Sequence, residues 1–465
     1  MHFISTLIVG RQRWRVGRLP KAMPSTAIWL TIIVLIGLTL RLIWALHVQP
    51  EPFGDTYWYI NAATNLAEGK GFVANHHNPL SEPPDTPLPT AYYPPAYPLA
   101  LAGVFKVFGV SLTSAKVFNA VLGALTIPFV YAIARRLFDR RVGLLAAAAF
   151  ALFPNAIVWL PLPLSEPLFT LLFTAALWVL VAFRSKPFAF GAAAAVGFGL
   201  LAGLATLTRG TGLVLLPVAL LFWLMRDGGR TGLRQLGLTL LATAAVLMPW
   251  TIRNWVVVDS PIVLASNTGV NLRMGHGPDA NGTVILLNDT VYGIPGWRSL
   301  ERPEWEVEGY RFYTQRAIHY ALTHPGRELE LSAQKIRYLY QSDSSELPAL
   351  TAWGGAPLRP SGLEDVLGPL TDASWYTVLF AALGLAPFWL RRTPQQVMFV
   401  AVLVFWTLFH VVFFGLPRFH LPLFPLLIVA AAGGLWTAVG TLCSWFGRLF
   451  PQRLRLPGER AVAPR

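Results

Sequence analysis

Apolar runs of about 20 residues, the length that crosses the hydrocarbon core of a bilayer, dominate the chain. Ten of them stand out, at residues 27–46, 115–134, 142–160, 167–183, 188–207, 211–225, 233–250, 374–390, 396–415 and 420–440. A shorter apolar piece, 96–108, follows Pro94-Pro95 and is predicted to be a helix lying at the interface. The pattern therefore predicts an all-α polytopic membrane protein with about ten transmembrane helices.

The composition agrees with this pattern. Hydrophobic residues make up 54% of the 465 residues and charged residues 13%, whereas a soluble globular protein carries about a quarter charged residues. Mean hydropathy is +0.51. Cys443 is the single cysteine, which excludes an intramolecular disulfide, a Cys-rich zinc site and an iron–sulfur cluster.

The basic residues are distributed unevenly along the chain. If the N-terminus is inside and the spans alternate, the inside segments hold 21 Lys and Arg against 3 acids, and the remainder holds 16 basic and 20 acidic residues. This is a strong positive-inside signal. It predicts a multi-pass protein of the cell (inner) membrane with both termini cytoplasmic. The first apolar run is interpreted as an uncleaved anchor. The net charge of +14 is interpreted as a determinant of topology and of contact with anionic lipids, not as a nucleic-acid-binding feature.

The loops divide the chain into five parts. They are a basic N-terminus (1–26), a transmembrane core (27–250) with a first outside loop at 47–114, an extracytoplasmic segment (251–373), the last spans (374–440) and a basic tail (441–465). The first loop predicts a helix at 56–68, stopped by glycines. The extracytoplasmic segment predicts two amphipathic helices on either side of His324-Pro325-Gly326, the second with a stripe of Leu329, Ala333, Ile336 and Tyr340.

Ionisable residues collect at the outside ends of the predicted spans, where each needs a reason because insertion costs about 2.5–3.5 kcal/mol per charge. They are Arg41, Asp55, Glu166, Arg209, Arg253, Arg418 and His420. A carboxylate can take the proton of an attacking hydroxyl, and guanidinium groups can hold a departing phosphate. The set therefore predicts transfer to a hydroxyl from a phosphate-linked donor whose lipid tail lies in the membrane.

Each of these residues also has a structural interpretation. Asp55 and Glu166 can cap the helices that they open. Arg41 and Arg209 can pair with those acids or extend toward lipid headgroups. Arg253 and Arg418 can contact headgroups in the same way. The residue types alone leave these alternatives open.

Several short motifs follow one another in a fixed order. They are Gly54-Asp55-Thr56, Gly69-Lys70-Gly71-Phe72, Tyr93-Pro94-Pro95-Ala96-Tyr97-Pro98, Arg135-Arg136-Leu137-Phe138, Ser165-Glu166-Pro167-Leu168-Phe169, Leu207-Thr208-Arg209, Pro249-Trp250-Thr251-Ile252-Arg253-Asn254 and Gly269-Val270-Asn271-Leu272. In this order the chain resembles the bacterial branch of the C-type membrane glycosyltransferases, which includes lipid A aminoarabinose transferases and is related to protein O-mannosyltransferases. The resemblance covers about residues 25–340, and Arg418–Pro422 is similar to a late segment of the family.

The resemblance implies a polyprenyl-phosphate-linked sugar donor, and transfer on the outer face to a lipid, glycan or protein hydroxyl. Asp55 matches the general base of the family, and Glu166 an acid that positions donor or acceptor. Aminoarabinose transferases place a charged pair before the proline of the first loop, where this chain has Tyr92-Tyr93. That difference argues against aminoarabinose and favours Arg253 and Arg209 as phosphate ligands. Lys70, Tyr93, Arg418 and His420 complete the candidates.

The sequence leaves open a divalent cation and two other functions, a glycan ligase or polymerase and a transporter or flippase. Asp55 and Glu166 are hard oxygen ligands, so a divalent cation is possible; related oligosaccharyltransferases use one with an extra acid, but this chain reads Asp55-Thr56-Tyr57, so none is predicted to be obligatory. An O-antigen ligase or polymerase would depend on paired arginines in large outside loops. A transporter or flippase would place polar groups near the midplane and often carry inverted repeats, and no repeat is visible.

Overall fold

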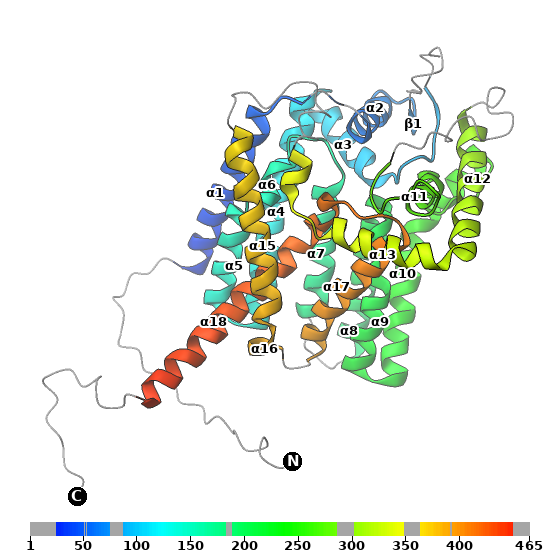
Figure 1. Ribbon diagram of the computed structural model, residues 1–465. Coiled ribbons are helices and arrows are strands. Elements are labelled where there is room, and N and C mark those ends of the chain that lie inside the picture. Colours follow the sequence, from blue (N-terminus) through cyan, green and yellow to red (C-terminus); the bar gives the residue numbers. More distant parts are fainter. Residues whose placement is uncertain are drawn as a thin grey trace, which may run out of the picture.

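The computed structural model describes residues 25–50, 52, 54–74, 87–182, 188–285, 302–347, 363–390 and 393–449 (Figure 1). Over these ranges the chain is almost entirely helical. One short antiparallel ribbon pairs β1 (Val73–Ala74) with β2 (Leu88–Pro89). The predicted all-α polytopic fold class is confirmed. Of the predicted basic termini, 1–26 and 441–465, residues 1–24 and 450–465 lie outside the described residues, and residues 441–449 form the end of a helix.

Within the described ranges, eight helical segments are long and apolar enough to cross a membrane. They are α1 (Thr26–His47), α4 (Leu112–Leu137), Gly191–Thr208 of α8 (Phe188–Thr208), Gly210–Asp227 formed by η1 (Gly210–Val214) and α9 (Leu215–Asp227), α10 (Gly229–Val258), Asp365–Gly384 of α15 (Leu363–Gly384), α17 (Pro394–Val412), and Pro417–Phe446 formed by η4 (Pro417–Leu423) and α18 (Phe424–Leu449). The other two predicted spans are shorter helices. Residues 167–183 form α7 (Glu166–Ala182), and 142–160 form α5 (Arg140–Leu152) and α6 (Asn155–Val158).

The break between α5 and α6 explains the buried Arg41. Pro154 has no N–H to continue the helix, so carbonyl groups at the end of α5 need other donors. The guanidinium of Arg41, fully buried, donates to the carbonyls of Phe150 and Ala151 at 3.1 and 2.8 Å. Pairing of Arg41 with Asp55 or Glu166, which the sequence left open, is therefore not what the structure shows.

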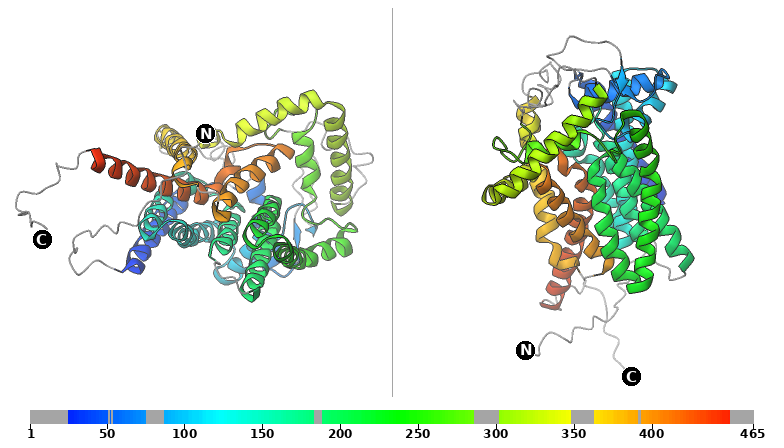
Figure 2. Two further views of the ribbon diagram at one scale, coloured as in Figure 1. Left: turned by 90° about the horizontal axis from the view of Figure 1, so that it is seen from below. Right: turned by 90° about the vertical axis from the view of Figure 1, so that its right-hand side faces the viewer.

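The elements that connect the spans gather at one end of the bundle, uppermost in Figure 1. They include α2 (Asp55–Ala67), α3 (Ala96–Phe108), α11 (Asn267–Gly275) and α12 (Arg302–Thr323). Below them α13 (Pro325–Leu339) lies across the bundle (Figure 2). The helices predicted at 56–68, at 96–108 and on both sides of His324-Pro325-Gly326 are thus confirmed. Two short elements, η3 (Asp343–Glu346) and α16 (Ala386–Trp389), complete the described chain.

One detail of the prediction is wrong and another is compatible with the structure. Leu329 and Ile336 of the predicted stripe on α13 are 76% and 40% exposed, as residues facing a membrane surface would be, and the buried face of α13 consists of Leu331, Lys335 and Leu339. Helix α15 begins eleven residues before the predicted start of its span at 374, because the helical segment continues beyond the apolar run that the hydropathy pattern marks.

Helices α8 and α10 pack closely against each other and are together called the α8–α10 wall. A Cβ atom on Gly199 would overlap the carbonyl oxygen of Thr239, so only glycine allows this approach. Hydrogen bonds from threonine hydroxyls cross the same contact, from Thr239 to the carbonyl of Ala195 at 3.2 Å and from Thr243 to that of Gly199 at 3.0 Å. The wall ends at Arg209, directly after α8.

Candidate active site

Asp55 is the first residue of α2, and the chain turns sharply just before it. Gly54 has φ of +55°, a conformation that a side chain would strain. The helix starts without a side-chain cap, so the capping role that the sequence left open for Asp55 is not seen. Its carboxylate is turned to other partners instead. The Tyr93 hydroxyl donates to Oδ1 at 2.5 Å, and Nη2 of Arg418 donates to Oδ2 at 2.8 Å.

Glu166 opens α7, where the positive end of the helix dipole favours a carboxylate. Its Oε1 lies 2.8 Å from Nη1 of Arg209, an ion pair in which Glu166 is 4% exposed and Arg209 19%. Arg209 lies in extended conformation between α8 and η1. The turn is tight, because a Cβ on Gly212 would overlap backbone atoms of Thr206. Structural pairing of Arg209 with an acid is therefore confirmed.

Arg418 joins the two carboxylates into one cluster. Besides its bond to Asp55, its Nε lies 3.8 Å from Oε1 of Glu166, and its side chain is 9% exposed. The site thus combines two carboxylates and two guanidinium groups at the end of the bundle that carries α2 and α3. Because the four charges cancel, the resting cluster is formally neutral.

The electrostatics of Asp55 reflect these partners. Burial raises the pKa of the Asp55 carboxyl, but the charge of Arg418 and the hydrogen bonds from Tyr93 and Arg418 outweigh it, so the pKa lies below its ordinary value. Burial together with the Asp55 charge raises the pKa of Tyr93 well above its ordinary value. Asp55 is therefore an ionised carboxylate at neutral pH, and Tyr93 remains a neutral donor to it.

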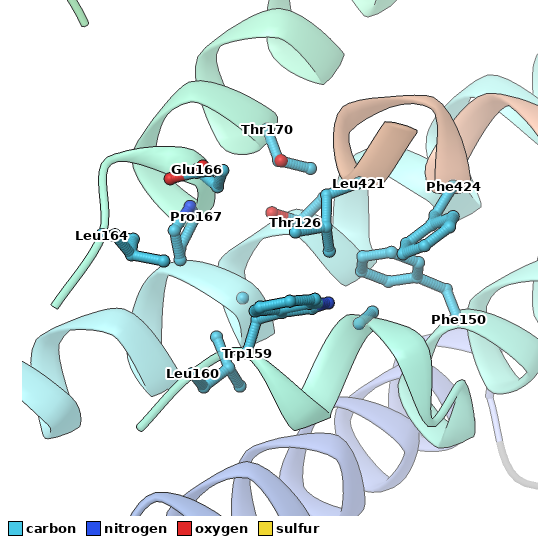
Figure 3. Close-up of a pocket in the computed structure, with 12 residues that line it drawn as sticks. Thr126, Phe150, Trp159, Leu160, Leu164, Glu166, Pro167, Thr170, Leu421 and Phe424 are labelled. Carbon is cyan, nitrogen blue, oxygen red and sulfur yellow. The ribbon is translucent and has the colours of Figure 1, made fainter. Parts of the chain in front are cut away.

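Glu166 contributes to the lining of two pockets. The first has an empty volume of about 170 Å³ including its mouth, and its lining contains Arg209, Arg418 and His410. The second, about 460 Å³ on the same measure, is largely apolar and extends past Trp159 and Phe424 (Figure 3). The Oε2 atom of Glu166 has no hydrogen-bond partner among the described residues. The carboxylate can therefore accept a hydrogen bond from a ligand.

Asp55 and Glu166, which the sequence left open as ligands of a divalent cation, both lie against the guanidinium of Arg418, which bonds to Asp55 directly. In the part of the chain that the structure describes, no group of three or more His, Cys, Asp or Glu could hold a metal ion. Positive charge is supplied here by an arginine.

Three predicted site residues are engaged elsewhere. Arg253 donates to the carbonyls of Thr90 and Phe72 at 2.7 and 2.8 Å, which attaches the first outside loop to α10. Lys70 forms an ion pair of 2.6 Å with Glu68 on the surface, where both side chains are about half exposed. His420 is fully buried two residues beyond Arg418. Of the predicted residues, the structure thus brings together Asp55, Glu166, Arg209, Tyr93 and Arg418.

The sequence did not single out other residues that contribute to the site. Ser165 accepts a hydrogen bond from Arg209 at 3.2 Å and one from Tyr59 at 3.3 Å, and so connects α2 to α7. His410, in α17, lines the pocket that contains Arg209 and Arg418, which is called the cationic pocket below. The only available signal for Ser165 was its place before Glu166, and for His410 its polarity inside an apolar run.

Comparison with known proteins locates this fold. Residues 92–255, about a third of the chain, match the family described as dolichyl-phosphate-mannose-protein mannosyltransferase. The archaeal oligosaccharyltransferase AglB from Archaeoglobus fulgidus, in complex with an inhibitory peptide and a dolichol-phosphate, is 16% identical over 94% of this chain and 52% of that one, with a TM-score of 0.53. Its apo form is 17% identical over 93% of this chain and 52% of that one, with a TM-score of 0.53. No curated protein matches the chain.

A weaker likeness, with a TM-score of 0.44, is to ArnT from Cupriavidus metallidurans bound to undecaprenyl phosphate, at 14% identity over 93% of this chain and 82% of that one. The chain spans about half the length of the archaeal enzyme. The chain shares its fold with the archaeal oligosaccharyltransferase. The sequence match with the mannosyltransferase family begins one residue before Tyr93 and ends two residues after Arg253.

Replacing Tyr93 by Phe should shift the pH dependence of the activity predicted from the sequence, in which Asp55 is the base. A carboxylate base is active when ionised, so activity falls as the pH drops through its pKa. Loss of the Tyr93 hydrogen bond removes one interaction that lowers the pKa of Asp55, so the acid limb should move upward by about one pH unit. The measurement is kcat/KM against pH. Tyr97→Phe is the matched control, because that hydroxyl bonds to Asn119; an equal shift in both variants would contradict the assignment.

Proposed function

We propose that this protein transfers a sugar from a polyprenyl-phosphate donor to the hydroxyl of an acceptor at the membrane surface. The observation that carries the proposal is the position of Arg418 between Asp55 and Glu166, beside Arg209. The fold and the mannosyltransferase match support it. So does the dolichol-phosphate in the complex of the archaeal relative, a ligand of the proposed chemical class.

The proposed reaction needs one proton acceptor. The acceptor oxygen attacks the anomeric carbon, the bond from that carbon to the phosphate oxygen breaks with inversion, and the hydroxyl proton passes to Asp55. The products are the glycoside, a polyprenyl phosphate and a protonated carboxyl group. Asp55 suits this role because it is 24% exposed, so that an acceptor can reach it. Glu166, which lines both pockets, is assigned to positioning the donor.

Arg418 and Arg209 are the proposed phosphate ligands, since both line the cationic pocket. A donor phosphate competes with Asp55 for Arg418. When the guanidinium turns to the phosphate, Asp55 loses the charge that lowers its pKa most strongly and becomes a stronger base. In this scheme the donor prepares the base, which favours binding of the donor before the acceptor. The sequence-based assignment of the phosphate to Arg253 becomes the weaker alternative, since both terminal nitrogens of Arg253 already bind carbonyls.

The membrane placement belongs to the same proposal. The cluster lies at the end of the bundle where α2 and α3 gather (Figure 1), which the charge count assigns to the outside. A polyprenyl tail can then lie in the bilayer while its phosphate reaches the arginines. The termini would be cytoplasmic, and the protein would reside in the cell (inner) membrane. The acceptor is left as a hydroxyl of a lipid, glycan or protein.

Chelation of divalent cations should leave the reaction intact. Arg418 already supplies a cation between the two carboxylates, so transfer measured in excess EDTA should proceed at the rate found with added Mg²⁺ or Mn²⁺. Wild-type activity after chelation and dialysis is the comparison. Loss of transfer that added Mn²⁺ restores would contradict this expectation.

The test of the proposed function is transfer of label from radiolabelled polyprenyl-phosphate sugars in membranes that contain the protein. We expect label to leave the donor and to appear in a product with a glycosidic bond, which also identifies the acceptor class. If the labelled donor changes leaflet with its phosphate bond intact, the protein is a flippase. Transfer of a preassembled glycan, without turnover of single-sugar donors, would indicate a ligase or polymerase.

A further inference from the structure

His420 lies two residues after Arg418 in η4 and is completely buried. Its Nδ1 is 2.8 Å from the carbonyl oxygen of Leu339, and its Nε2 is 3.3 Å from Oδ2 of Asp343. The ring of Trp375 stacks on the imidazole, with 3.9 Å between centroids and 12° between planes. Both nitrogens and one face of the ring are therefore occupied, which argues against the direct phosphate contact predicted for His420.

Asp343 is also completely buried and connects His420 to the rest of the bundle. The side-chain amide of Asn155 donates to Oδ2 of Asp343 at 2.5 Å and to the carbonyl of Thr371 at 3.0 Å. The cluster thus links the end of α13, η3, α6 and α15 to η4. Because a carbonyl oxygen only accepts, Nδ1 of His420 carries the hydrogen of its contact with Leu339. Removing one partner from a buried cluster of this kind leaves polar groups unpaired, which is costly.

The backbone between this cluster and Arg418 is short and stiff. Pro417 and Pro422 fix φ at two positions of η4. A run of seven residues in 3₁₀ conformation is longer than usual, so the geometry is maintained by tertiary contacts. On the other side of Arg418, the N–H of Gly415 donates to the carbonyl of Gly282 at 2.9 Å. The arginine is therefore carried on a segment that is fixed before and after it.

We infer that His420 and Asp343 are positioning residues, which hold η4 so that Arg418 reaches Asp55 and Glu166. The inference rests on the proposed function, because it assigns the cluster to the chemistry of that site. A displacement of about 1 Å in a residue that orients substrate can lower a rate about 100-fold. Asp343, in η3 between α13 and α15, thereby supports the arginine that contacts the donor in the proposed function.

The test is a double-mutant cycle on transfer from a polyprenyl-phosphate sugar, with kcat and donor KM measured separately. His420→Ala should lower kcat/KM for the donor about 100-fold. His420→Gln, which keeps a donor group for Asp343, should recover part of the loss. In an Arg418→Lys background the same His420→Ala change should cost little, since its effect passes through Arg418.

Thr239→Val provides the control for stability, because it removes buried hydrogen bonds in the α8–α10 wall, outside η4. It should lower the melting temperature without changing donor KM. Equal losses from His420→Ala in both backgrounds, or wild-type kinetics in that variant, would overturn the inference while the proposed function stands. A wild-type protein that transfers no sugar from any polyprenyl-phosphate donor would overturn both.

Discussion

Replacing Asp55 by Asn should lower the rate of sugar transfer about 1,000-fold while donor binding changes little. The amide is nearly isosteric and can still accept the Tyr93 hydrogen bond, but it cannot take a proton from the acceptor. Arg418, no longer paired with a carboxylate at this position, stays available to the phosphate. The measurement is single-turnover transfer from labelled donor, together with donor affinity on the purified protein in detergent.

Asp259→Asn is the matched control for this variant. Asp259 is exposed and has φ of +50°, a left-handed conformation that Asn also tolerates. Its replacement should leave transfer unchanged. An Asp55→Asn protein that is folded and transfers sugar at the wild-type rate would exclude Asp55 as the base.

Replacing Arg418 by Gln should affect both binding and rate. The change removes a ligand of the donor phosphate and leaves Asp55 without its ion pair. We expect kcat/KM for the donor to fall about 100- to 1,000-fold, as for loss of one preorganised charge-stabilising group. Arg418→Lys should retain part of the activity, since it keeps the positive charge but loses the planar guanidinium that contacts both Asp55 and Glu166.

The control for Arg418 is Arg311→Gln, because Arg311 forms an exposed ion pair with Glu308 on α12. A pair of this kind contributes little, so its kinetics should match the wild type. If Arg418→Gln raised kcat by freeing Asp55 and left donor KM unchanged, the assignment of Arg418 to the phosphate would be wrong.

The helices could be predicted well because the bilayer imposes a length on apolar runs. Each of the ten runs has most of its described residues in helices, and the rejection of 96–108 as a span agrees with the 13-residue α3. The runs could not show the break at Phe153-Pro154, since both sides are equally apolar. Nor could they place the start of α15, whose first turns carry charged residues within the helix.

The sequence could predict the level along the spans at which the site residues lie, but not the orientation of their side chains. Position along a span showed that Asp55, Glu166 and Arg209 lie near one level. It did not show which way each side chain points around its helix, so Arg253 was ranked above Arg418. The proposed function reverses this order, because backbone carbonyls of the first loop accept hydrogen bonds from Arg253. Asp343, the carboxylate beside His420, lies in η3, for which the sequence pattern predicts no element.

The neutrality of the resting cluster has a consequence for turnover. In the proposed reaction, transfer converts a phosphodiester with one negative charge into a phosphate monoester with up to two, and it leaves a proton on Asp55. When that proton is released to water, the regained carboxylate competes with the lipid phosphate for Arg418. Restoring the ion pair between Arg418 and Asp55 therefore helps to expel the spent lipid carrier. The ion pair between Arg418 and Asp55 thus lowers the basicity of Asp55 before the reaction and favours release of the polyprenyl phosphate after it.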